Sequence, residues 1–64
     1  MTTEEIDTAF ENATDAELRE TEEGFKLYIA KPEIFKGTMN FYGWVDEEDA
    51  EEVQERIKDM KEEN

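Results

Sequence analysis

The sequence has no cysteine, no histidine and no serine. Without thiols it can form neither a disulfide framework nor a thiolate metal site. Without histidine it lacks the commonest general base and metal ligand. A Ser-His-Asp or Cys-His catalytic pair is impossible with these residue types. The composition therefore predicts a protein that is not an enzyme and that has no cofactor and no metal centre.

Glycine, proline and long apolar runs are also scarce. The three glycines are too scattered to form a phosphate-cradling loop. No apolar run approaches the roughly 20 residues that cross a bilayer. The acidic segment 1–7 does not have the character of a signal peptide. The dense acidic run 46–49 lacks the spacing and the central glycine of an EF-hand loop. We expect a cytoplasmic protein that does not contact membranes.

Negative charge is what the chain has in excess. Twenty acidic residues stand against seven basic ones, which gives a net charge of −13 on 64 residues. A chain of this length forms one domain at most, here 1–64, and buries only about 60% of its surface. Its four Phe, two Tyr and one Trp indicate a folded core rather than a disordered polyanion.

The strongest structural pattern lies between residues 25 and 45. Residues 25–30 alternate in the period of two that is typical of a half-buried strand, and Pro32 ends the pattern. A second strand is predicted over 38–45, where Gly43 indicates a bulge or a close backbone approach. The two strands are predicted to pair as an antiparallel hairpin.

Alternation divides the side chains of these strands between two faces. The predicted core face consists of Phe25, Leu27, Ile29, Met39, Phe41 and Val45. The predicted opposite face consists of Lys26, Tyr28, Asn40, Tyr42 and Trp44. The link 33–37 contains the apolar residues Ile34 and Phe35, which either close the edge of the core or form an exposed apolar tip.

Helical patterns flank the hairpin. Thr2 and Glu5 have the spacing of a capping box, and the helix that follows is predicted to end near 12–14. Asp46 is a good N-cap for a last helix that runs to about Lys61. The apolar stripes that cover the sheet are predicted to be Ile6, Ala9, Phe10 and Ala13 in the first helix, and Ala50, Val53, Ile57 and Met60 in the last.

Residues 15–22 allow two interpretations. Thr14 and Glu17 repeat the capping-box spacing, which favours a second helix with Leu18 as its apolar anchor. The alternative is a third strand at 18–21, hairpinned to the next through residues 22–24. The predicted fold is therefore an α+β domain of order α-(α)-β-β-α, or alternatively α-β-β-β-α, with helices packed on one face of an antiparallel sheet.

The acidic residues concentrate in the flanking arms. Residues 1–24 carry nine acids and one base, and residues 46–64 carry ten acids and three bases. The segment 25–45 carries one acid and three bases. The carboxylates are therefore predicted to belong to the helical arms and to form one broad acidic surface. A solvated helix face that only keeps the protein soluble is the simpler interpretation.

The charge exceeds what solubility requires in a small domain, which is a net charge of about 2 to 8. We expect a small protein-binding module that imitates nucleic acid, as a phage- or mobile-element-encoded (viral) inhibitor would, and occupies a basic surface meant for phosphates. The expected partner is a nucleic-acid-binding protein, with no direct contact to nucleic acid. The predicted partner-binding residues are Tyr28, Tyr42, Trp44, Glu47, Glu48, Glu51, Glu52 and Glu55.

The sequence also allows two alternative functions. The chain is an engineered or purely structural domain with no evolved partner, or it is a homodimer or complex subunit that uses Tyr28, Tyr42 and Trp44 on an exposed sheet face. Tyrosine and tryptophan are enriched at the energetic centres of interfaces, although aromatic pairs across strands also stabilise a sheet.

Overall fold

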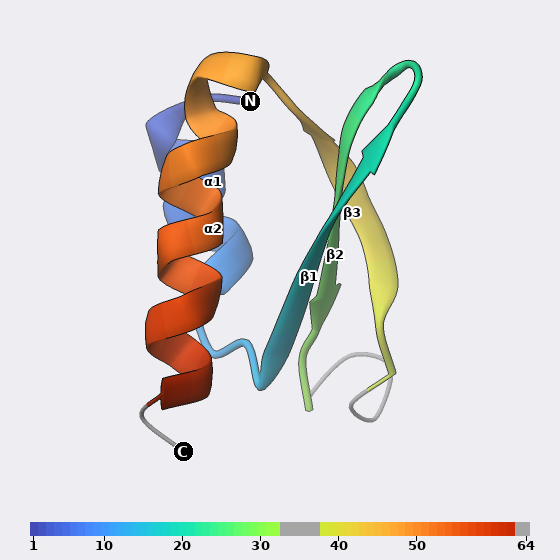
Figure 1. The fold of residues 1–64 in the computed structure, drawn as a ribbon. Helices are drawn as coiled ribbons and strands as arrows, with labels where there is room; N and C mark the ends of the chain where they lie inside the picture. The colour runs from blue at the N-terminus through green and yellow to red at the C-terminus, as the bar shows by residue number, and fades with distance from the viewer. Residues whose placement is uncertain (33–37, 63–64) are drawn as a thin grey trace.

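The computed structural model describes residues 1–32 and 38–62 (Figure 1). Its elements are α1 (Thr3–Phe10), β1 (Asp15–Thr21), β2 (Gly24–Ala30), β3 (Asn40–Val45) and α2 (Glu47–Glu62). The three strands form one antiparallel sheet of order β1-β2-β3. Both helices lie on the same side of this sheet (Figure 1). The α+β class is confirmed, and the order is the alternative one, α-β-β-β-α. The segment 33–37, with Ile34 and Phe35, falls outside the described residues.

The favoured prediction of a second helix at 15–22 is wrong, because these residues form β1. The amide of Thr14 donates to the carbonyl oxygen of Ala30 at 2.8 Å, and the Thr14 hydroxyl reaches the same oxygen at 3.3 Å. Thr14 thus leads the chain into the sheet instead of capping a helix. In the paired strand, Ala16 is opposite Ile29 and Leu18 is opposite Leu27. Burying these apolar side chains outweighs the helix propensity of the segment.

A two-residue turn at 22–23 joins β1 to β2, one residue shorter than the link 22–24 of the strand alternative. The Thr21 hydroxyl donates to the carbonyl oxygen of Gly24 at 2.8 Å and accepts from the amide of Glu23 at 3.3 Å. Gly24 has a φ of +141°, a backbone conformation that favours glycine. The turn therefore depends on one hydroxyl and one glycine.

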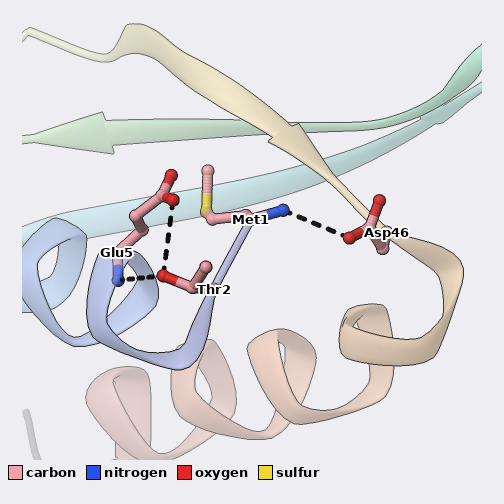
Figure 2. A network of polar contacts seen from close by, with 4 residues as sticks. All are labelled: Met1, Thr2, Glu5 and Asp46. Atoms are coloured by element: carbon pink, nitrogen blue, oxygen red, sulfur yellow. Dashed lines mark hydrogen bonds and ion pairs between the residues drawn. The ribbon is translucent and has the colours of Figure 1, made fainter.

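The first helix begins at the predicted cap, but it ends at Phe10, before the predicted range 12–14, so Ala13 lies outside the helix. The amide of Glu5 donates to the Thr2 hydroxyl oxygen at 3.2 Å, and that hydroxyl lies 3.3 Å from the Glu5 carboxylate (Figure 2). Thr2 is the N-cap, which confirms the first half of the capping box. After the C-cap Glu11, Asn12 has a φ of +60°, the left-handed conformation that commonly ends helices.

The last helix is also confirmed, to within one residue at its end. The Asp46 carbonyl accepts from the amides of Asp49 at 2.9 Å and Ala50 at 3.0 Å, which places Asp46 at the N-cap. α2 then packs across β1 and β2, with Ala50 and Val53 buried. Ile57 and Met60 pack against the same core and are partly buried.

A small apolar core fills the space between the helices and the sheet. Its buried members are Ile6, Ala9, Ala16, Leu27, Ile29, Val45, Ala50 and Val53. Ile6, Leu27 and Val53 are its largest fully buried side chains, and they come from α1, β2 and α2. Leu27, on the central strand β2, is thus one of the three large side chains at the centre of the core.

A bulge in β3 overturns part of the predicted face assignment. Leu27 pairs with Gly43, but the next residue of β2, Tyr28, pairs with Phe41, so Tyr42 is the extra residue. Phe41 consequently lies on the face away from the helices and is 50% exposed, whereas it was predicted in the core. The predicted bulge is confirmed next to Gly43, and a Cβ at Gly43 would meet Cε of the Met1 side chain at 3.0 Å.

Candidate docking surfaces

Three aromatic rings form a continuous row on the sheet face that the helices leave open. Tyr28 and Phe41 meet edge to face with ring centroids 5.8 Å apart, and Phe41 meets Trp44 in the same way at 6.1 Å. Phe41 is 50% and Trp44 43% exposed. We call these residues the aromatic row. Contacts between the rings hold them in place, so the row is preorganised for contact.

Two cations lie against the aromatic row. The Arg19 guanidinium carbon lies 4.5 Å from the centroid of Tyr28, and Lys26 Nζ lies 5.3 Å from that of Trp44. These are cation–π distances. Arg19 also donates to Glu17 Oε2 at 3.0 Å, and this hydrogen bond, with the charge of Glu17, raises the pKa of the Arg19 guanidinium.

The predicted aromatic set is only partly brought together. Tyr28 and Trp44 belong to the aromatic row, as predicted. Tyr42 lies on the other face, where it lines a shallow hollow together with Thr2, Glu4, Glu5 and Thr8 of the α1 region. The sequence analysis missed Phe41, and Gly43 was the signal that could have found it, because a bulge at that point inverts the alternation of the residues before it.

The carboxylates of α2 form a second surface, on the far side of that helix from the core. Glu48, Glu52 and Glu55 project opposite Ala50 and Val53, since an α-helix repeats every 3.6 residues. We define the acidic face of α2 as Glu47, Glu48, Glu51, Glu52, Glu55, Asp59 and Glu62, all of which are exposed. The five predicted glutamates are thus on one surface, and the prediction omitted Asp59 and Glu62.

The density of charge on this face approaches that of one nucleic-acid strand. At a rise of 1.5 Å per residue, Glu47 and Glu62 lie about 22 Å apart along the helix axis. Seven carboxylates over that length give roughly one per 3 to 4 Å. A single strand of duplex DNA has about one phosphate charge per 3.4 Å of axis. Lys58 and Lys61 lie along the same helix and reduce the net value.

Within residues 1–32 and 38–62, no ion pair includes a carboxylate of the acidic face of α2. Arg56, on the flank of the helix, pairs with Asp7 of α1 at 2.5 Å. The Met1 ammonium pairs with Asp46. These two pairs link the α1 region to the α2 region.

The acids are not confined to the helices, which corrects the expected division between helical arms and hairpin. β1 and its turn to β2 carry five of them, namely Asp15, Glu17, Glu20, Glu22 and Glu23. The error follows from assigning residues 15–22 to a helix. α2 nevertheless carries more exposed carboxylates than any other element in the described part of the chain.

In the described ranges, no group of three or more acidic side chains is placed to hold a metal ion. Neither α1 nor α2, as far as the structure describes them, combines the length and the apolar character that crossing a membrane requires. No protein-family model, no curated protein and no solved structure matches the chain.

Proposed function

We propose that the protein is a binding module whose acidic face of α2 docks on a basic, nucleic-acid-binding surface of another protein and blocks it. One observation carries this proposal: seven exposed carboxylates follow one helix face at nearly the charge spacing of a nucleic-acid strand, and no ion pair described in the structure neutralises them. Glu47, Glu48, Glu51, Glu52 and Glu55 act as the phosphate substitutes.

The arrangement of these carboxylates is costly for the fold, which favours a role beyond solubility. Glu47 and Glu51, Glu48 and Glu52, and Glu51 and Glu55 are like-charge pairs at i,i+4 on α2. Each such pair destabilises a helix by about 0.2–0.5 kcal/mol. A basic partner would relieve this repulsion on binding. The same field would steer the encounter, so the association rate should fall steeply as salt is added.

The test compares two triple variants with the same net charge. Glu48→Gln/Glu52→Gln/Glu55→Gln neutralises the centre of the acidic face of α2. Glu20→Gln/Glu22→Gln/Glu23→Gln removes the same three charges from β1 and its turn, where all three side chains are also exposed. Comparison with this control therefore distinguishes the effect of the acidic face of α2 from the effect of the net charge of the molecule.

The readout is displacement of nucleic acid. Basic proteins captured from a lysate on the immobilised chain are purified, and the free chain is titrated into each one bound to labelled duplex DNA or RNA. We expect displacement by the native chain, a loss of about tenfold or more in potency for the α2 variant, and less than about threefold for the control. Equal losses in both variants, or binding to partners without displacement of nucleic acid, would refute the proposal.

A further inference from the structure

The open sheet face differs in charge from the rest of the protein. The strand register and the alternation of side chains place four charged residues on this face: Asp15, Glu17, Arg19 and Lys26. Two acids and two bases balance on this face, although the whole chain has a net charge of −13. This is the face on which another strongly acidic molecule meets the least repulsion.

From this balance and from the exposure of the aromatic row, we propose that the open sheet face binds a second copy of the chain, face to face around a two-fold axis. A two-fold contact places the same patch against itself, so the patch must complement itself. The aromatic rows supply apolar contact. Glu17 of one copy then faces Arg19 of the other, and both already form a pair within the chain at 3.0 Å.

The orientation also separates the charges that would oppose association. Both helices lie on one side of the sheet (Figure 1), and the strand register places the aromatic row on the other side. In a face-to-face dimer the two acidic faces of α2 therefore point away from each other, on opposite outer surfaces. Any dimer built through the helices would instead bring these carboxylates together. A dimer built through the aromatic row leaves both acidic faces of α2 free to bind a partner. This inference does not depend on the proposed function.

The size of the face predicts a weak dimer. Strands of about seven residues at 3.3 Å each, spaced 4.8 Å apart, give a face of roughly 300 Å² per copy. A stable complex buries about 800 Å² per partner. We therefore expect association at high micromolar concentration, and we expect it to strengthen with salt, since screening reduces the repulsion between two copies. This salt dependence is opposite to that of the proposed partner binding.

Sedimentation equilibrium measures the strength of the dimer and its dependence on salt. The protein concentration runs from about 10 μM to about 1 mM, at about 0.05 M and about 0.5 M salt. Phe41→Ser removes an exposed ring of the aromatic row and should weaken the dimer about tenfold or more. Tyr42→Ser is the matched control, because that ring is 41% exposed on the other face, and it should change the dimer less than about threefold. Circular dichroism of both variants is the control for folding.

A charge swap tests the self-complementarity. Arg19→Glu leaves the face with three acids and one base, so it should abolish dimerisation. The double variant Glu17→Arg/Arg19→Glu restores the balance and should restore the dimer to within about threefold of the native constant. A monomer up to about 1 mM at both salt concentrations would overturn the proposal and leave the face to a partner of different chemistry. A dimer that is sensitive to Tyr42→Ser and not to Phe41→Ser would place the contact elsewhere and would also overturn it.

Discussion

The amino-terminal ammonium of Met1 lies 3.2 Å from Oδ2 of Asp46, and so joins the start of α1 to the start of α2 (Figure 2). The Met1 side chain is only 4% exposed, whereas that of Asp46 is 72% exposed. The apolar part of Met1 is thus buried against the sheet at Gly43. Its charge is held near the surface, where salt can screen the pair.

The first prediction concerns this contact. Asp46→Asn keeps a side-chain oxygen but removes the charge that faces the Met1 ammonium. Because Asp46 is mostly exposed, we expect a loss of less than about 1 kcal/mol in the free energy of unfolding at low salt, and almost none at high salt. Urea denaturation at two salt concentrations measures this. Acetylation of the Met1 amine removes the other partner, and its effect should not add to that of Asp46→Asn.

The second prediction distinguishes two glycines. Gly24→Ala forces a residue with a Cβ into a φ of +141°, so it should cost about 1–3 kcal/mol of unfolding free energy although the nearest atom is 3.6 Å away. Gly43→Ala instead meets Cε of Met1 at 3.0 Å. That methyl ends a flexible side chain and can move, so we expect a loss below about 1 kcal/mol. Chemical denaturation compares the two, and a larger loss at Gly43 would contradict this account.

The third prediction concerns the centre of the core. Leu27 is fully buried on the middle strand between both helices and the sheet. Leu27→Ala should cost about 2–5 kcal/mol, which is comparable to the whole stability expected of a core this small. Loss of the circular dichroism signal at 25 °C would report the unfolding. Leu18→Ala, at a partly buried position of β1, is the control and should leave the protein folded.

The fourth prediction concerns repulsion on the acidic face of α2. Glu51 has carboxylates at both i−4 and i+4, which belong to Glu47 and Glu55. Glu51→Gln should therefore raise the free energy of unfolding by about 0.5–1 kcal/mol. Glu47→Gln loses the favourable interaction of a first-turn acid with the helix dipole, and the change should be close to zero. A stabilisation at Glu47 equal to that at Glu51 would show that only net charge matters.

Secondary structure was predicted correctly from the sequence where local signals and burial agree. The N-cap at Thr2, β2 and α2 were all predicted, because capping chemistry and apolar spacing indicate the same structure there. The end of α1 was predicted at 12–14, whereas the helix ends at Phe10. β1 was predicted only as an alternative. Its segment contains good helix formers and only two apolar residues, Ala16 and Leu18, and the strand forms because β2 is available to pair with it.

The candidate surfaces were also predicted only where a local pattern determines the structure. The glutamates of α2 were placed on one face, because helical periodicity alone determines that. The faces of β3 were assigned by strict alternation, and a single extra residue at Tyr42 reverses the alternation for Phe41. Gly43 indicated a bulge, but a glycine alone does not determine which neighbour is displaced. The roles of Tyr28, Tyr42, Trp44 and the five glutamates in partner binding stay predictions.

That bulge has a further consequence for a protein kept at high concentration. β1 and β3 are both edges of the sheet, with backbone groups that could pair with a strand of another chain. The irregularity at Tyr42 interrupts the straight ladder that such a strand would need along β3, and the acids of β1 repel an approaching copy at the other edge. Both features disfavour sideways growth of the sheet by edge-to-edge pairing.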